Sequence, residues 1–277
     1  MQTDFTSIGV FHFGKDHGKP ILALESAISD FIGNGGTLKN SLVVLPEGFN
    51  LGRHYYGMEP PKDDLSILDC LASLSTTFQC AFVAGLVVKD TPGVSPPYSS
   101  AYLIDGLCQP RQQILTRKKK KDSTETSRVF PDDSWVANYT ACPTYEPRAL
   151  SQRGLAVAAL ICLDAESDLE SRDDYDLRCD AVAKMLSDCK CRHSLLCIPA
   201  YMSNGLDGGR IGANIILRES LRGTIHALAN SCAGHVSSFI TNRQGEIVLN
   251  VGRDVNQIVT APLTQATAGG NDHAVSR

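Results

Sequence analysis

The chain has 277 residues, of which 43% are hydrophobic and 20% are charged, and its net charge is −4. These values are typical of a globular protein with one large core, and they give no sign of nucleic-acid binding, since the only dense basic cluster spans residues 117–121. No uncharged apolar run approaches the ~20 residues that a membrane-spanning helix needs, so we expect neither nucleic acid nor a membrane as a partner.

The N-terminal residues and the cysteines indicate a cytoplasmic protein. The chain begins without a basic region followed by an apolar stretch, so no signal peptide is expected. Its ten cysteines are scattered, and Cys80, Cys162 and Cys197 lie in apolar runs typical of buried strands, which favours reduced thiols. Cys189 and Cys191 are close in sequence but lack a second pair of ligands, so no metal site is predicted.

Apolar runs and amphipathic stretches alternate over the first ninety residues. Apolar residues at positions 21, 22, 24, 28, 31 and 32 have helical spacing, and a Gly-Asn-Gly-Gly sequence ends that helix. The continuous apolar run at 41–46 is typical of a strand covered on both faces. In chain order, the pattern predicts strands at 8–13, 41–46 and 81–88, and helices at 20–32 and 63–77.

One hairpin is predicted in the middle of the chain and another near its end. Residues 101–106 and 113–116 flank a turn that contains Pro110, and residues 236–241 and 246–251 flank an Asn-Arg-Gln-Gly turn. The polar loop between them, at 122–150, is long enough to be functional or mobile. The remaining predictions are strands at 155–163 and 194–199, helices at 174–188 and 211–229, and a C-terminal tail at 266–277.

Strand–helix alternation followed by hairpins predicts antiparallel pairing within an α/β core. Two such sheets packed face to face, with helices on their outer faces, would bury both sheets. Because the sequence contains no internal repeat and no linker, we expect a single domain over residues 1–265.

Three strand ends carry reactive side chains, and strand ends are where ligands bind in open α/β sheets. Glu47 directly follows one buried strand, Cys162 lies near the end of another, and a lysine run occupies 118–121. Each has a structural alternative, because a buried cysteine often serves as a small apolar side chain and charged residues in turns are often only solvated. Singly, none of the three would identify an enzyme.

In combination, two segments resemble signature segments of the nitrilase-like (carbon–nitrogen hydrolase) superfamily: LVVLPE at 42–47 and LICLD at 160–164. The family's third catalytic segment, a strand that ends in lysine, lies between them, as the lysine run does here. The resemblance extends over roughly residues 5–262. It implies a four-layer α-β-β-α sandwich of two mixed sheets with helices outside, assembled as a homodimer or higher homo-oligomer.

The resemblance also implies a Glu-Lys-Cys triad that forms a thioester, with Cys162 as nucleophile and Glu47 as general base. The lysine would stabilise the thiolate and the oxyanion formed when that thiolate attacks an amide carbonyl. Lys120 fits the separations along the chain, whereas matching the Thr-Arg-Lys at 116–118 to the family's Tyr-Arg-Lys selects Lys118, so both remain candidates. The mechanism requires no metal and no organic cofactor.

Departures from the family's pattern concern the substrate more than the reaction. The nucleophile segment usually continues Asp-x-Arg-Phe-Pro-Glu, and here Asp164 is present but the Arg and Pro are absent. A second active-site glutamate has no well-placed counterpart, since Glu125 has a poor offset and Glu146 is too distant. A Cys-Leu-Asp sequence at the nucleophile favours the amidase and carbamoylase branches over true nitrilases.

Four further residues are candidates for substrate binding, each with a structural alternative. Asp164 either holds a backbone amide near the nucleophile or caps a helix. Tyr201 and Asn204 follow the next predicted strand, and they line either a pocket or an exposed loop. His54 follows Glu47 closely, and it lies either beside the substrate or in a surface loop.

These features predict a hydrolase that acts on a non-peptide C–N bond of a small amide or carbamoyl compound. Two alternatives are compatible with the same fold. One is a non-catalytic binding or assembly protein, and the other is an acyltransferase that passes the acyl group to an amine instead of water.

Overall fold

The computed structural model describes residues 3–14, 19–54, 66–89, 97–117, 147–165, 172–200, 219–230, 237–251 and 255–267. Its first sheet has the strand order β12 (Asn256–Pro262), β1 (Ser7–Phe13), β2 (Ser41–Leu45), β3 (Ala81–Lys89), β4 (Pro97–Ile104) and β5 (Gln112–Arg117). Its second sheet has the order β11 (Ile247–Asn250), β10 (Phe239–Thr241), β9 (Ile225–Asn230), β8 (His193–Ala200), β7 (Leu155–Ala159) and β6 (Leu150–Gln152).

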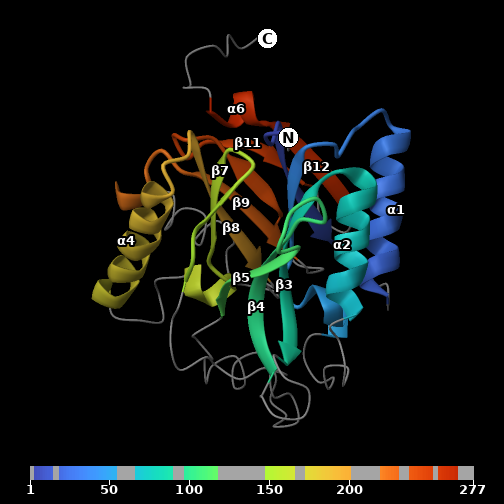
Figure 1. Cartoon of the computed structure of the whole chain (residues 1–277), viewed down its shortest axis with the longest axis horizontal. Helices are drawn as coiled ribbons and strands as arrows, with labels where there is room; N and C mark the ends of the chain where they lie inside the picture. The colour runs from blue at the N-terminus through green and yellow to red at the C-terminus, as the bar shows by residue number, and fades with distance from the viewer. Residues whose placement is uncertain are drawn as a thin grey trace.

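Helices cover the outer faces of the two sheets (Figure 1). On the first sheet lie α1 (Pro20–Gly33) and α2 (Ser66–Phe78), and on the second lies α4 (Arg172–Asp188). Shorter helical segments are η1 (Phe49–His54), η2 (Cys162–Ala165), η3 (Glu219–Leu221) and α6 (Leu263–Thr267). This arrangement confirms the predicted four-layer α-β-β-α sandwich.

Each sheet combines parallel and antiparallel strands. In the first, β1, β2 and β3 are parallel, β4 and β5 add an antiparallel hairpin, and β12 pairs antiparallel with β1. In the second, β7, β8 and β9 are parallel, and antiparallel strands flank them on both sides. A hydrogen bond from the Glu47 N–H to the Ala200 carbonyl (3.3 Å) joins the ends of β2 and β8, so the parallel strands of both sheets end at one common edge.

Strand residues alternate between two apolar cores. On β1, Ile8 and Val10 pack between the two sheets, whereas Phe11 and Phe13 pack beneath the helices. β2 is buried along its whole length, which confirms the prediction made from the apolar run at 41–46.

Helix α1 shows why the outer helices form where they do. Pro20 lies in its first turn, where a missing N–H leaves no hydrogen bond unmade. After its end, Gly35 adopts the left-handed conformation that commonly terminates a helix (φ +86°). The buried side chains recur one turn apart: Ala23, Leu24, Ala27 and Ile28.

The helix predicted at 211–229 is wrong for the residues that the structure describes there. Ile225–Asn230 form β9, a strand that is fully buried between β8 and β10. Burial in the sheet overrides the helical preference of the alanine and leucine residues in this six-residue run. Residues 211–218 lie outside the described residues.

The C-terminal part of the fold adds further differences. β12 and the three-residue β6 were not predicted, because one is half polar in sequence and the other is very short. Helix α6 extends to Thr267, two residues into the segment predicted as a tail, and its Ala266 is buried.

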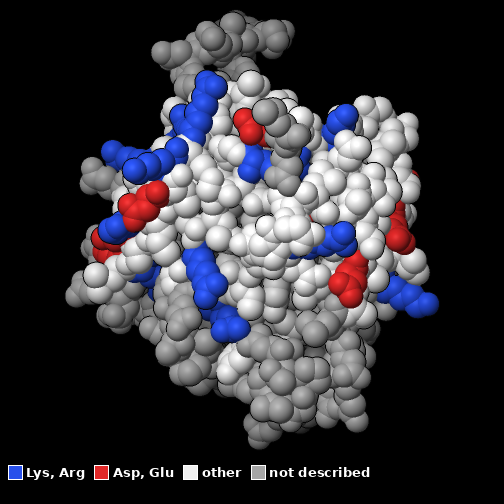
Figure 2. All heavy atoms as spheres, in the orientation of Figure 1, with Lys and Arg blue, Asp and Glu red and all other residues white. Residues whose placement is uncertain are grey.

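Among the described helices, none combines the length and the apolar character needed to cross a membrane. Acidic and basic side chains are interspersed on the face shown in Figure 2.

Candidate active site

Glu47 is buried immediately after β2. Its side chain is 1% exposed, and the next residue, Gly48, turns the chain with a φ of +62°. The Glu47 N–H donates to the Ala200 carbonyl on the opposite sheet, and its Oε1 accepts a hydrogen bond from the Ser99 hydroxyl (2.9 Å) on β4. The carboxylate therefore has a fixed place at the common edge of the two sheets, as a buried charged group requires.

Close backbone packing holds the segment around Glu47. At Gly85 on β3, a Cβ would lie only 2.7 Å from the Glu47 Cα and 2.8 Å from the Pro199 Cβ. Glycine thus allows three strand segments to meet at this point. Farther along, the Asn50 amide donates to the Val87 carbonyl (2.8 Å) and accepts from the Val87 N–H (2.9 Å), which attaches η1 to β3.

Cys162 lies in a turn that follows β7. The predicted strand at 155–163 ends at Ala159, and Cys162 begins η2 with a φ of +43°. This left-handed conformation costs a non-glycine residue about 1–3 kcal/mol, and such residues cluster at functional sites. The turn is closed by a hydrogen bond from the Asp164 N–H to the Ile161 carbonyl (2.8 Å), and the Cys162 side chain is 4% exposed.

Asp164 is fully buried, and its Oδ1 lies 3.8 Å from Nη1 of Arg178 on α4. This contact ties the turn that carries Cys162 to the helix that covers the second sheet. Sequence reasoning missed Arg178. The available signal was its position four residues before Val182 and eight before Leu186, on the buried stripe of a helix.

The lysine run begins where β5 ends. Arg117, the last residue of β5, is paired with Ser100 on β4, next to the serine that binds Glu47. The chain therefore enters the run at the same edge of the sheet as Glu47. Lys118 and Lys120 themselves lie outside the described residues.

The other predicted site residues are only partly described. Tyr201 and Asn204 lie outside the described residues, although Tyr201 directly follows Ala200, whose carbonyl binds the Glu47 N–H. His54 ends η1, and its side chain lies outside the described part. Glu125 and Glu146 also lie outside it.

Neighbouring strands bring the two halves of the candidate site to one edge. β7, which precedes Cys162, is the parallel neighbour of β8, whose last residue binds Glu47. A hydrogen bond from the Leu160 N–H to the Cys197 carbonyl (3.0 Å) continues this pairing beyond the end of β7. A thiol and a buried carboxylate at one edge are the groups needed for nucleophilic attack with general-base assistance.

Burial shifts the pKa values of three other groups in the described part away from neutral pH. Burial, and secondarily Asp105, raises the pKa of the Cys80 thiol to about 12, and burial also raises the pKa of Cys197, so both stay protonated at neutral pH. Burial lowers the pKa of His226 to about 4, and its Nδ1 lies 3.2 Å from the Thr241 hydroxyl. None of these groups is poised for chemistry near pH 7.

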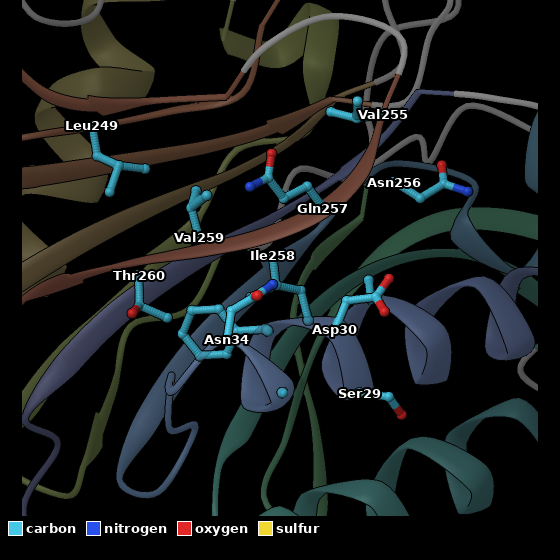
Figure 3. A pocket seen from close by; sticks show the side chains of 13 residues that line it. Ser29, Asp30, Asn34, Leu249, Val255, Asn256, Gln257, Ile258, Val259 and Thr260 are labelled. Atoms are coloured by element: carbon cyan, nitrogen blue, oxygen red, sulfur yellow. The ribbon is translucent and has the colours of Figure 1, made fainter.

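A cavity of about 690 Å³ lies elsewhere, between α1 and β12 (Figure 3). Asp30 of α1 and Asn34, which follows this helix, line one side of it, and Gln257 and Thr260 line it from the strand. β1 separates β12 from β2 in the sheet, and none of the predicted site residues that the structure describes lines this cavity. The cavity is therefore distinct from the candidate active site.

No family model matches the sequence, and no curated protein matches it. Solved structures of a nitrilase-superfamily amidase from Nesterenkonia sp. AN1 are similar to this chain. One crystal structure of the amidase has a TM-score of 0.62 at 16% identity, covering 95% of this chain and 91% of that chain. A mutant with the acetamide moiety of fluoroacetamide covalently added at its active-site cysteine gives a TM-score of 0.63 at 16% identity, covering 94% and 90%. A double mutant in complex with acrylamide gives 0.61 at 15% identity, covering 93% and 90%. The chain therefore has the fold of the nitrilase superfamily.

Proposed function

We propose that this chain, built on the nitrilase-superfamily fold, hydrolyses a non-peptide C–N bond of a small linear amide or carbamoyl compound. One observation carries the proposal: Cys162 occupies a buried, left-handed turn at the sheet edge where the buried Glu47 carboxylate is also held. The covalent cysteine adduct of the structurally similar amidase supports the same chemistry.

In the proposed reaction, the Glu47 carboxylate takes the thiol proton of Cys162, and the thiolate attacks the carbonyl carbon of the substrate. A lysine ammonium, from Lys120 or alternatively Lys118, stabilises the oxyanion of the tetrahedral intermediate. Glu47 then passes its proton to the leaving nitrogen, the C–N bond breaks, and a thioester remains on Cys162. Glu47 next takes a proton from water, the resulting hydroxide attacks the thioester, the C–S bond breaks to release the acid, and Glu47 returns its proton to the Cys162 thiolate.

Whole-protein mass spectrometry tests this reaction. Wild type and Cys162→Ala are incubated with a panel of small amides and carbamoyl compounds, and each protein is weighed. We expect an acyl adduct on wild type that is absent from Cys162→Ala, accompanied by ammonia or amine release. The mass of the adduct identifies the acyl group.

The same assay separates the alternatives. Product formed only when hydroxylamine or another amine acceptor is added would identify an acyltransferase. No adduct and no ammonia, with Cys162 alkylated no faster than the other cysteines, would identify a non-catalytic protein and overturn the proposal. Lys120→Ala and Lys118→Ala identify the lysine, since loss of the catalytic cation lowers kcat by about 100-fold or more and loss of its neighbour does not.

We further propose that the enzyme works in the cytoplasm as a homodimer or higher homo-oligomer. Cys70, Cys80 and Cys197 are among the free cysteines of the described part, which supports a reducing compartment. The proposal of an oligomer rests on the resemblance to the superfamily. Light scattering coupled to size-exclusion chromatography measures the assembly, and a monomeric mass would contradict this part of the proposal.

A further inference from the structure

We propose that Ser99 is a positioning residue for Glu47, and that it acts on the reaction only through the Glu47 carboxylate. The inference rests on the proposed function, because it assigns Ser99 a part in the same site. Its carrying observation is the 2.9 Å hydrogen bond from the Ser99 hydroxyl to Oε1 of Glu47, between two side chains that are 0% and 1% exposed.

The direction of this hydrogen bond follows from the chemistry of the two groups. An ionised carboxylate only accepts hydrogen bonds, so the hydroxyl must donate when Glu47 is ready to act as a base. Ser99 lies on the same face of β4 as Ala101 and Leu103, which pack between the two sheets. The hydroxyl thus reaches Glu47 from the face of β4 that packs between the two sheets. Both residues are buried there, so bulk water does not compete for the carboxylate.

Ser99 lies within a paired strand, whereas Glu47 lies beyond the end of its strand. β4 is paired on both sides, with Val87 of β3 opposite Ser99 and Arg117 of β5 opposite the next residue. Val87 is itself bound by the Asn50 amide through two hydrogen bonds. Glu47, in contrast, lies in a turn beyond the end of its strand. A hydroxyl on a doubly paired strand gives the carboxylate a fixed reference point.

Fixing one carboxylate oxygen sets the rotation of the whole carboxylate plane, and with it the direction of the second oxygen. Proton transfer from a thiol or a water requires that oxygen within about 2.6–3.2 Å of the donor. Without the Ser99 hydroxyl, Glu47 keeps its place in the chain but loses one of the contacts that set this orientation. Displacements of about 1 Å at reacting groups lower rates by roughly 100-fold, so the hydroxyl should affect kcat more than KM.

The chain offers a matched control in the adjacent serine. Ser100 is also 0% exposed, but it has the parity of Tyr102 and Ile104, which pack on the helix side of the sheet. Its hydroxyl makes no hydrogen bond with the described residues. Two neighbouring serines therefore share strand and burial but differ in contact with Glu47.

The test compares Ser99→Val, Ser99→Thr and Ser100→Ala in the full-length chain. Valine and threonine have nearly the same shape: both branch at Cβ with an added methyl group, but threonine keeps the hydroxyl and valine replaces it with a second methyl. For each variant we would measure kcat and KM with the amide found by mass spectrometry, the rate at which iodoacetamide alkylates Cys162, and Tm. Ser99→Ala accompanies them, because it removes the hydroxyl without added volume if valine prevents folding.

We expect Ser99→Val and Ser99→Ala to lower kcat and the alkylation rate by roughly 10- to 100-fold, with KM nearly unchanged. Ser99→Thr should restore most of both rates, and Ser100→Ala should behave as wild type. In a Glu47→Gln background, removing the hydroxyl should cause no further loss, because its action passes through the carboxylate.

Equal losses in the threonine and valine variants would overturn the proposal, since the added methyl would then be the cause. Full activity of Ser99→Ala, or a further loss in the Glu47→Gln background, would overturn it as well. The alkylation rate separates this inference from the proposed function. If no amide turns over but Cys162 alkylation depends on the Ser99 hydroxyl, the positioning role stands and the proposed hydrolysis fails.

Discussion

At the scale of single residues, the backbone of Cys162 distinguishes the candidate nucleophile from the other buried cysteines. Cys80 and Cys197 lie next to or within regular strands, whereas Cys162 occupies a left-handed turn with a φ of +43°. A sharp turn directly after a strand presents a side chain at the sheet edge, as nucleophile-bearing turns do in other hydrolases. Strain at this residue is thus associated with its proposed role.

This strain predicts an unusual order of stability. Cys162→Gly should be about 1 kcal/mol more stable than Cys162→Ala, because only glycine adopts the left-handed conformation without strain. The free energy of unfolding in urea measures the difference between these two variants. As a control, Ala165→Gly in the same turn should lose stability, since Ala165 has no positive φ. An alanine variant more stable than the glycine variant would show that the turn relaxes.

At the scale of elements, the site depends on how closely the ends of β2, β3 and β8 approach one another. Gly85 permits this approach, because a Cβ at this position would overlap both the Glu47 Cα and the Pro199 Cβ. The position of Glu47 is therefore a property of three strands that come from distant parts of the chain.

We expect Gly85→Ala to lower the free energy of unfolding by about 1–3 kcal/mol, since the added methyl overlaps backbone that must then shift. Amide hydrolysis by the remaining folded protein should also fall, because Glu47 moves with that backbone. Gly33→Ala is the control, as an added Cβ there meets nothing within 4 Å and alanine favours the helix. Normal activity in a stable Gly85→Ala protein would contradict the proposed role of this contact.

At the scale of the whole molecule, polar contacts join the two sheets at both ends of their strands. The hydrogen bond between Glu47 and Ala200 joins them at the candidate site. At the opposite edge, the buried carboxylate of Asp105 accepts a hydrogen bond from Gln152 (3.0 Å) and lies 3.9 Å from Arg153. These contacts of Asp105 lie at the opposite end of the strands from the candidate active site.

Gln152→Leu tests the contribution of the hydrogen bond between Gln152 and Asp105. It should lower the free energy of unfolding by about 1–3 kcal/mol, because buried Asp105 loses a hydrogen-bond donor. Ser151→Ala, at the exposed neighbouring position, should change it far less. Urea unfolding gives both values. The rate of Cys162 alkylation should stay unchanged in each variant, and a slowed rate would show that the two edges are coupled.

Buried His226 makes the stability of the molecule depend on pH. The unfolded imidazole binds a proton below about pH 6.5, whereas burial lowers the pKa of the folded one to about 4. The unfolded state therefore gains protons first, and the free energy of unfolding falls as the pH drops from about 6.5 toward 4. At pH 5 this one group accounts for on the order of 2 kcal/mol. In His226→Asn the difference between unfolding at pH 7.5 and pH 5 should shrink, and an unchanged difference would assign the effect to other groups.

Sequence reasoning succeeded where the physical cause was local. Continuous apolar runs marked β2 and β7, and with them the strand ends that carry Glu47 and Cys162. β12 escaped prediction because three of its seven residues are polar and its partner, β1, lies more than 240 positions earlier in the chain. Ser99 and Arg178 escaped for a similar reason, since only the assembled sheets and helices show what a serine or an arginine contacts.

The pairing of β12 with β1 has a consequence for synthesis of the protein. Residues 7–13 leave the ribosome more than 240 positions before their partner at 256–262. Until that partner emerges, β1 has an open hydrogen-bonding edge, which is a site for wrong pairing between nascent chains. The first sheet is complete only once residues 256–262 have been made, so its assembly depends on a long-range contact. Stalled chains that lack 256–262 should consequently aggregate and depend on chaperones.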